Sequence, residues 1–405
     1  MQMFTPIQYL KIDIAGNHSM GKAKWDDRIE FFDKNEANLD DLIKTAKDPA
    51  LFYAGVQAYR KAMKGEPTGY PISLDATASG AQIMAVLIGC EKSARLCNVI
   101  DTGDREDFYK NVYTEMCKRV PDVTNFATAE ETKKAIMTAL YGSLAVPKRV
   151  FGEGAMLQAF KDTMNAAAPG VWALNSAMLD LWQADTLSHD WSMPDNFHVR
   201  NKVMADRKET VLFLDDAYEV YTKVNAPVET GKSIGANICH SIDGMIVREM
   251  GRRCTYEPAQ LRKATRICLE ASITTHTATA YTTLTDNVKM VKMLTERFKE
   301  SGFLSARIVD HIDQDSIHYA PLEPLLKLLE SMPAIPFPVL MIHDCFRVLP
   351  NYGNALRKQY NQILYEIANS TMLEYLASQI TGSQVTAERF DHFADQILQA
   401  DYALS

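Results

Sequence analysis

Two aspartates stand beside short apolar segments in distant parts of the chain. Asp75 follows the apolar run Tyr70–Leu74, and Asp344 separates two further apolar runs, 337–342 and 345–349. Packing an ionised carboxylate against apolar strands costs free energy unless the charge is paired or bound to a metal. Each residue alone could be an ordinary turn aspartate. Together they could hold Mg²⁺, which prefers one or two carboxylates and takes its other ligands from water and phosphate.

A helix between these aspartates is predicted from its first residues. Thr128 and Glu131 form a capping box, so a helix should run from there to Leu140, with Gly142 at or just past its end. Two-metal phosphoryl transfer needs cations on the non-reacting phosphates as well as metal-binding carboxylates. A helix carrying a lysine is therefore a candidate partner of the two aspartates.

The relevant residues of this helix share one face. Lys133, Met137 and Tyr141 recur every four residues, which places them on the same side. Lys133 could hold a triphosphate while Tyr141 stacks near a base or sugar. Gly142 has no side chain, so a nucleotide could approach the backbone closely. The alternative is an ordinary amphipathic helix with a solvated lysine.

The rest of the chain is mostly helical in pattern. Apolar residues recur at helical spacing in 24–65, 79–97, 151–184, 232–335 and from 352 onward. Residues 70–74 predict a short strand. Residues 209–225 predict a β-hairpin with the acidic tip Asp215–Asp216, and residues 337–349 predict a tight hairpin with His343–Asp344 at its turn.

Composition limits the class of protein. The 405 residues are 47% hydrophobic and 23% charged, as in a globular protein with large cores. The sequence has no run of 18 apolar residues, and its start lacks a basic segment followed by an apolar one. We therefore expect a cytoplasmic protein without a membrane helix. The seven cysteines form no CxxC pair, which favours reduced core thiols. A net charge of -8 is unlike a free-standing DNA binder, although a local basic groove would suffice.

Three segments resemble the signature motifs of the single-subunit DNA-directed RNA polymerases of phages and mitochondria. Asp75–Gln82 resembles the motif Asp-x-x-x-Ser-Gly-x-Gln, and Lys133–Ser143 resembles Lys-x-x-x-Met-Thr-x-x-Tyr-Gly-Ser. His343–Phe346 resembles His-Asp-Ser-Phe, with Cys345 in place of the serine. Their order and spacing also agree. Weaker similarities extend nearly from end to end, at Leu10–Ile12, Tyr53–Gln57, Arg95–Asn98, Tyr109, Asn237–Gly244, Phe393–Gln396 and Asp401–Ser405.

The resemblance implies a helix-rich α+β fold of the right-hand polymerase type, with palm, fingers and a small antiparallel palm sheet. The palm would comprise 1–92 and 336–405. The fingers would comprise 93–250, including the hairpin 209–225. Residues 251–335, between the segment of His240 and the third motif, would be a helical insertion.

The resemblance also implies roles for individual residues. Asp75 and Asp344 would bind two Mg²⁺ ions, with the Ala76 carbonyl as a further ligand. Lys133 would contact the incoming triphosphate, and Tyr141 would help select ribonucleotides. The implied nucleotide- and template-binding residues are Gly142, His240, His343, Lys134 and Arg95.

The sequence departs from the family in three respects. The family has an arginine where Ala129 stands, so Lys134 or a residue from elsewhere would have to supply that charge. The insertion 251–335 has no family counterpart. The thumb, the promoter-reading N-terminal domain and an Asp-x-x-Gly-Arg segment before the first motif have no counterpart in this chain either.

These departures predict a split enzyme that works as a heterodimer. A second subunit would supply the thumb and N-terminal elements, as in the two-chain phage RNA polymerases that transcribe middle genes, whose larger subunit this chain most resembles. The substrates would be a DNA template and ribonucleoside triphosphates, the product RNA, and the location the host cytoplasm. The hairpin 209–225 lies where the family carries its promoter-specificity hairpin. Its acidic tip predicts weak promoter reading, assisted by an accessory single-stranded-DNA-binding protein.

Two other functions remain open at the level of sequence. The first is a DNA polymerase of the related right-hand family, which shares the aspartates and the lysine helix. Tyr141 disfavours it, because that family usually has an aromatic residue without a hydroxyl at this position. The small Ser79–Gly80 pair also disfavours it, because that family carries a bulky glutamate near the sugar. The second is a non-catalytic polymerase-like scaffold, which the missing arginine favours and the retained Asp75 and Asp344 oppose.

Overall fold

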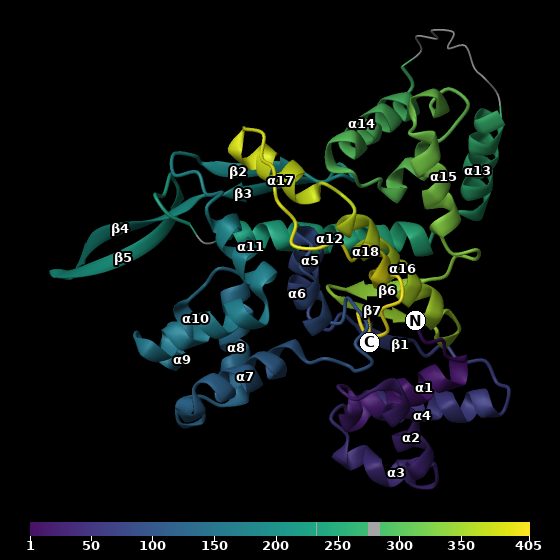
Figure 1. Ribbon diagram of the computed structural model, residues 1–405, viewed down its shortest axis with the longest axis horizontal. Helices are drawn as coiled ribbons and strands as arrows, with labels where there is room; N and C mark the ends of the chain where they lie inside the picture. Colours follow the sequence, from purple (N-terminus) through teal and green to yellow (C-terminus); the bar gives the residue numbers. More distant parts are fainter. Residues whose placement is uncertain (232, 274–283) are drawn as a thin grey trace.

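A computed structural model describes residues 1–231, 233–273 and 284–405. The fold is helix-rich α+β, with one three-stranded and two two-stranded antiparallel sheets in the described part (Figure 1). Short 3-10 helices connect the larger elements at Glu36–Asn38, Ile43–Thr45, Pro121–Asn125, Ala306–His311, Ile317–Tyr319 and Pro350–Tyr352.

The first lobe is built from four α-helices. They are α1 (Pro6–Ala15), α2 (Trp25–Asn35), α3 (Leu39–Leu42) and α4 (Pro49–Met63), with a π-helical turn at Gly16–Met20. Thr5 and Gln8 cap the start of α1, which packs against α2 and α4. The prediction of helix over 24–65 is confirmed, although the region is divided into separate helices.

The three-stranded sheet joins distant parts of the chain. Strand β1 (Ile72–Asp75) pairs with β7 (Cys345–Val348), which pairs in turn with β6 (Val339–Ile342). Both pairings are antiparallel, and Asp75 lies opposite Cys345. His343 and Asp344 form the turn between β6 and β7, as the hairpin prediction required.

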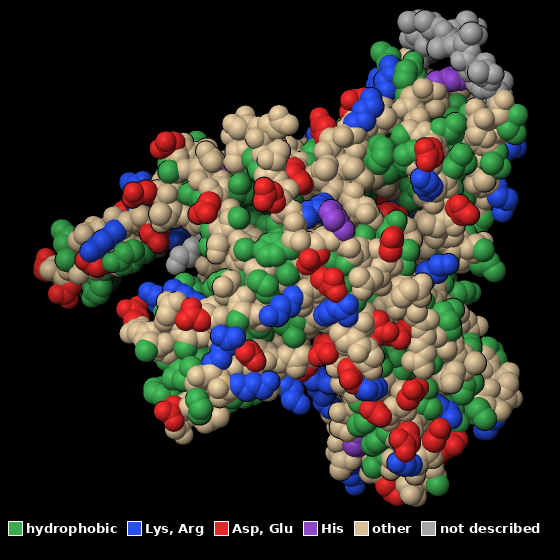
Figure 2. Space-filling view, in the orientation of Figure 1, with side chains coloured by type: hydrophobic (Ala, Val, Ile, Leu, Met, Phe, Trp, Pro, Cys, Tyr) green, Lys and Arg blue, Asp and Glu red, His purple; other side chains and the backbone are tan. Residues whose placement is uncertain are grey.

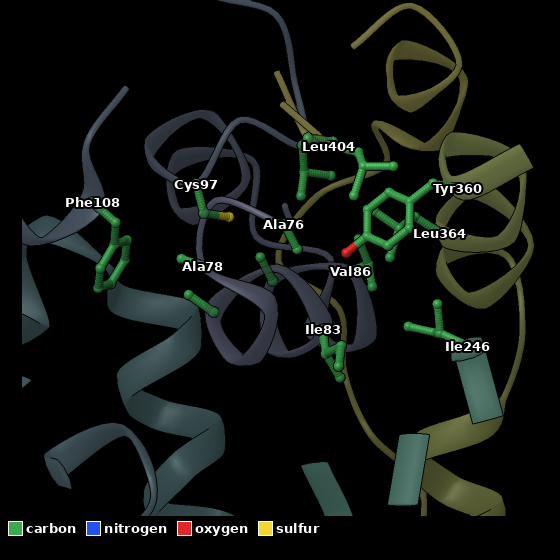
Figure 3. Close-up of a cluster of buried hydrophobic side chains, with 14 of the residues drawn as sticks. Ala76, Ala78, Ile83, Val86, Cys97, Phe108, Ile246, Tyr360, Leu364 and Leu404 are labelled. Atoms are coloured by element: carbon green, nitrogen blue, oxygen red, sulfur yellow. The ribbon is translucent and has the colours of Figure 1, made fainter. Parts of the chain in front are cut away.

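Helix α5 (Ser79–Ile88) runs through the main hydrophobic core, and every one of its residues is buried. It is followed by α6 (Glu91–Leu96), so the predicted helix 79–97 is divided near Gly89. Figure 3 shows Val86 of α5 in one cluster with Tyr360, Leu364 and Leu404. The helix therefore fixes the small residues that follow Asp75 against the centre of the molecule.

A second helical lobe follows α6. It contains α7 (Phe108–Arg119), α8 (Ala129–Leu140), α9 (Ala145–Phe151), α10 (Ala155–Ala167) and α11 (Pro169–Leu179). The capping box of Thr128 and Glu131 is present, so the predicted start of α8 is confirmed. The helical prediction for 151–184 is confirmed as α10 and α11, which break at Pro169.

Two hairpins follow this lobe. The first, β2 (Ser188–Ser192) with β3 (His198–Lys202), had no sequence prediction. The second, β4 (Met204–Phe213) with β5 (Asp216–Asn225), confirms the predicted hairpin and begins five residues earlier than 209. Leu214 and Asp215 have φ of 48° and 66°, as a type I′ turn requires. This ribbon projects from the body of the molecule (Figure 1).

The region 233–335 contains α12 (Ser233–Cys254), α13 (Pro258–Ile273), α14 (Asp286–Ser301) and α15 (Leu322–Ser331). The prediction of mostly helical structure over 232–335 is confirmed for the described residues, while residues 232 and 274–283 lie outside them. Helices α13–α15 enclose a second hydrophobic core that includes Ile267, Leu294 and Leu325.

The last elements are α16 (Gly353–Ala368), α17 (Met372–Thr381) and α18 (Ala394–Ile397). The segment after α18 returns to β1, where Ser405 and Asp75 exchange backbone hydrogen bonds of 2.9 and 3.3 Å. All seven cysteines are free, and five are buried, whereas Cys117 and Cys345 are only partly buried. None of the described helices has the length and apolar character needed to cross a membrane.

Candidate active site

The two aspartates of the first and third motifs lie at the same end of the three-stranded sheet. Asp75 is the last residue of β1 and faces Cys345, the neighbour of Asp344. The Ala76 amide donates a 3.0 Å hydrogen bond to the Asp344 carbonyl oxygen. Pairing of β1 with β7 therefore brings together two carboxylates that the sequence separates widely.

The burial expected for these carboxylates is wrong. Asp75 is exposed, and the Asp344 side chain is 40% exposed. Both residues flank buried strand positions, but each stands where its strand ends and its side chain reaches solvent. Desolvation cost therefore gives no argument that these two residues must bind a metal.

The donor chemistry of the site fits Mg²⁺. No described Lys or Arg forms an ion pair with Asp75 or Asp344. None of the hydrogen bonds among the described residues ends on the Ala76 carbonyl oxygen, although Ala76 is buried. Hard oxygen ligands of this kind suit Mg²⁺. Within the described part, no three His, Cys, Asp or Glu side chains could hold a metal together, so water and phosphate would complete the shell.

His343 lies between two carboxylates. Its Nδ1 is 3.3 Å from Asp243 Oδ2 and 3.5 Å from Asp344 Oδ1. The residue has a left-handed backbone with φ of 57°, which the tight turn requires. This geometry directs the imidazole toward α12, which carries Asp243.

Asp243 belongs to this cluster although the sequence reasoning did not include it among the site residues. The pKa of Asp243 is raised, chiefly because the carboxyl is buried. The imidazoles of His343 and His240 act to lower this pKa, and the charge of Asp344 acts to raise it. His240 and Asp243 are three residues apart on α12 and therefore share a face. That spacing was the available signal.

Tyr141 connects the end of α8 to this cluster. Its ring centroid is 5.2 Å from that of His240, which is 6.2 Å from that of His343. A Cβ atom added to Gly80 would lie 2.6 Å from the Tyr141 hydroxyl, so Gly80 makes room for that side chain. Burial, together with nearby negative charges, raises the pKa of Tyr141.

The Lys133 side chain, on α8, is half-buried. Its Nζ lies 5.7 Å from the centroid of the Tyr109 ring, and it has no ion pair with any described carboxylate. Burial first, then the charges of Asp107 and Asp344, raise the pKa of Tyr109 to about 12. Tyr109 is a second residue that the sequence reasoning noted only as a weak similarity.

Gly142 ends α8 in the conformation that the sequence predicts. Its φ is 80°, and its amide donates to the Ala139 carbonyl at 3.0 Å. Burial of Gly142 keeps this turn compact beside Tyr141. The backbone is thus close to the residues that would face a nucleotide.

Two of the expected binding residues lie elsewhere. Lys134 is 63% exposed and faces Glu130 at 4.0 Å on the outer side of α8. Arg95 pairs with Glu91 at 2.7 Å on α6. Arg95 lines a separate cleft with Lys92, Lys118 and Arg119, in a region where Lys and Arg side chains gather (Figure 2).

Comparison with known proteins supports one family. Residues 5–168 match the family model described as DNA-dependent RNA polymerase. The matched range includes Asp75, Lys133 and Tyr141, and it ends before His240 and Asp344. No curated protein matches the chain. The match indicates a DNA-directed RNA polymerase, which is a nucleotidyltransferase.

Proposed function

We propose that this chain performs template-directed RNA synthesis by two-metal nucleotidyl transfer, as the catalytic subunit of a split RNA polymerase. The observation that carries the proposal is the adjacency of Asp75 and Asp344 at one end of a sheet, next to Tyr141 and His240. The family match over 5–168 supports the DNA-dependent RNA synthesis that this arrangement suggests.

In this proposal, the chain supplies a metal site and a nucleotide site side by side. Asp75, Asp344 and the Ala76 carbonyl would hold two Mg²⁺ ions, which when bound neutralise phosphate charge and lower the pKa of an attacking hydroxyl. Lys133, which forms no ion pair within the described ranges of the chain, would bind the triphosphate. Tyr141 would contact the sugar.

The two histidines have a positioning role in the proposal. His343 holds its ring between Asp243 and Asp344, so it restrains the turn that carries Asp344. The His240 ring lies between those of Tyr141 and His343, tilted against the first and edge-on to the second, and would meet the template or the initiating nucleotide. Gly142 is itself buried, and it would shape the end of α8 beside the nucleotide.

We assign the palm to 1–92 and 336–405, because β1 and the β6–β7 hairpin form one sheet. The fingers would be 93–250. Residues 251–335 would be an inserted unit, an assignment supported by the separate hydrophobic core of α13–α15.

Exposed apolar residues support the presence of a second chain. Strand β6 is at the edge of the three-stranded sheet and exposes Leu340 at 60% and Ile342 at 66%. Exposed edge strands readily accept another strand or chain. We propose that a subunit carrying thumb and N-terminal elements covers this edge. A bacteriophage origin and a place in the host cytoplasm follow from the sequence resemblance alone.

The test uses a primed DNA template with Mg²⁺ and ribonucleoside triphosphates. The purified chain should extend the primer weakly alone and processively after its candidate partner is added. Processive extension by the chain alone would contradict the split-enzyme part. No extension with any partner or template would contradict RNA synthesis itself, and preferential use of deoxyribonucleotides would indicate a DNA polymerase.

A further inference from the structure

Arg105 is a half-buried cation beside the candidate metal site. Its Nε donates a 3.1 Å hydrogen bond to the Ser405 hydroxyl, the single hydrogen bond of its side chain among the described residues. Ser405 is itself bound to the backbone of Asp75 through two hydrogen bonds. Ser405 therefore links the Arg105 guanidinium to Asp75, which carries the first carboxylate of the site.

Three acidic residues surround Arg105 in sequence, and none of them pairs with it in the described part of the chain. Asp104 pairs with Lys24, and Glu106 accepts hydrogen bonds from the side chains of Thr102 and Asn111. Asp107 instead pairs with Lys22 at 2.5 Å and caps the start of α7 by accepting from the Lys110 amide at 3.2 Å. No described carboxylate forms an ion pair with Arg105. Its two terminal nitrogens are thus left with unused donors.

A second arginine lies behind the first. Arg28 is 4% exposed, and its guanidinium donates only to carbonyl oxygens, those of Ala23 at 3.1 Å and Gly21 at 2.7 Å. No described carboxylate pairs with it. Burial first, then repulsion from Arg105, lowers the pKa of Arg28 to about 9. Two neighbouring arginines that lack carboxylate partners form an electropositive site that a bound anion would stabilise.

The position of Arg105 indicates which anion would bind there. Arg105 precedes Tyr109 by four residues, and the Tyr109 ring lies under Lys133. Ala129 leaves the start of α8 without the arginine that the resemblance implies, and Lys134 points away from the cluster. Lys133 is thus the one α8 cation left for a triphosphate among the described residues.

We propose that Arg105, backed by Arg28, binds the β- and γ-phosphates of the incoming ribonucleoside triphosphate and the pyrophosphate that leaves. The inference rests on the proposed function and names a phosphate ligand of that same site. Arginine suits the task because its planar fork can donate two parallel hydrogen bonds to phosphate oxygens.

The experiment compares Arg105→Ala, Arg105→Lys and Ser405→Ala in the full chain with its partner. We measure kcat and KM for ribonucleotide addition, and KM for pyrophosphate in the reverse reaction. Arg105→Ala should raise both KM values about tenfold or more, as loss of a hydrogen bond to a charged group implies. Arg105→Lys should recover part of the loss, since it keeps the charge.

Ser405→Ala is the matched control, because it removes the hydrogen-bond acceptor of Arg105 and keeps the charge. It should leave both KM values near those of the unaltered enzyme, as should Arg60→Ala on the distant helix α4. If Ser405→Ala reproduces the Arg105→Ala defect, or if Arg105→Ala changes only stability, Arg105 merely anchors the chain near Ser405. If the unaltered enzyme adds no nucleotides, the proposed function fails instead.

Discussion

The His343 side chain lies between two carboxylates of the site, those of Asp243 and Asp344. The residue occupies a left-handed backbone conformation, which costs on the order of 1 kcal/mol for a residue other than glycine and which the β6–β7 turn compensates. Its ring stands 3.3 Å from the buried Asp243 and 3.5 Å from the more exposed Asp344. The imidazole thus links the turn that carries Asp344 to Asp243 on α12.

Asp344→Asn should abolish nucleotide addition without unfolding the chain. The change removes one negative charge from a 40% exposed side chain that has no Lys or Arg partner in the described part, so little packing is lost. Primer extension should fall by at least about three orders of magnitude if the carboxylate holds a metal, because metal sites supply several kcal/mol to the transition state. Circular dichroism provides the control for folding, and unchanged extension would mean that the site is elsewhere.

Gly80→Ala should destabilise the chain through Tyr141. The new methyl group would lie 2.6 Å from the Tyr141 hydroxyl and 3.1 Å from the adjacent ring carbon. Overpacking of this kind costs about 1–3 kcal/mol. Adding Tyr141→Phe should recover part of that loss, since it removes the closest atom. Urea denaturation of both single variants and the double variant measures the coupling, and independent effects would show that the two side chains do not meet.

The residue-level predictions from sequence succeeded where chemistry is local. Thr128 and Glu131 specify a helix start, and Gly142 specifies its end, because each acts through neighbouring backbone groups. The spacing from His240 was an available signal for Asp243, whereas sequence could not assign Tyr109 to the site, since its importance depends on contacts with residues from distant segments. The orientation of Lys134 depends on how α8 is rotated in the fold, and a helical periodicity does not fix that.

At the scale of elements, α12 is held by a buried network of charges. Asp195, which follows β2, accepts from Arg248 Nε at 2.6 Å and Arg252 Nη1 at 2.9 Å. Glu249 and Arg253 are fully buried, and Arg253 pairs with Glu366 of α16 at 2.5 Å. Each of these three arginines is therefore paired with at least one carboxylate, and the partners Asp195 and Glu366 come from outside α12.

Asp195→Asn should lower stability at neutral pH by about 3–5 kcal/mol, as for one partner removed from a buried ion pair. Burial raises the pKa of Asp195, but hydrogen bonds and charges from Arg248 and Arg252 outweigh it, and the pKa is lowered. The folded-state pKa is below the unfolded one. The stabilisation is therefore present above the unfolded pKa and disappears as pH falls through the folded one.

The measurement is the free energy of unfolding in urea at pH 7 and at steps below pH 4. The difference between Asp195→Asn and the unaltered chain should shrink as the solution becomes more acidic. Asp190→Asn is the matched control in the same hairpin, because Asp190 is 54% exposed and stands 3.9 Å from Arg200. A constant difference at all pH values would contradict the assignment to the Asp195 carboxylate.

Most helices and two of the hairpins were predicted as elements, but β2, β3 and the helices α1, α7 and α9 were not. The strands Ser188–Ser192 and His198–Lys202 mix polar, charged and aromatic residues, and their pairing comes from tertiary contacts rather than alternation. Helix α9 contains Pro147 in its first turn, where proline is tolerated but reads in a sequence as a break.

On the scale of the whole molecule, the β4–β5 hairpin stands apart from both cores. Near its tip, Leu212, Phe213 and Leu214 are 75%, 62% and 81% exposed, next to Asp215 and Asp216. Figure 2 shows apolar and acidic side chains together at this end. An acidic tip does not suit phosphate binding. Its apolar residues suit contact with a protein instead.

Replacing Leu212, Phe213 and Leu214 by serine should leave stability within about 0.5 kcal/mol, as expected for exposed positions. Extension of a primed template should also be unchanged. Initiation that depends on an accessory single-stranded-DNA-binding protein should fall, because the proposed contact is lost. The assay compares primed extension with factor-dependent initiation on the same enzyme preparation. Equal loss of both activities would mean that the hairpin supports the active site directly.

The long-range pairing of β1 with β7 has a consequence for how the active enzyme forms. Ser73 and Cys345 touch at 3.1 Å across a separation of 272 residues. Closing so large a loop has an entropic cost and delays non-local pairing relative to local helix formation. During refolding from urea, helical circular dichroism should therefore return before primer extension does. The two carboxylates become a single functional unit only at the end of the folding reaction.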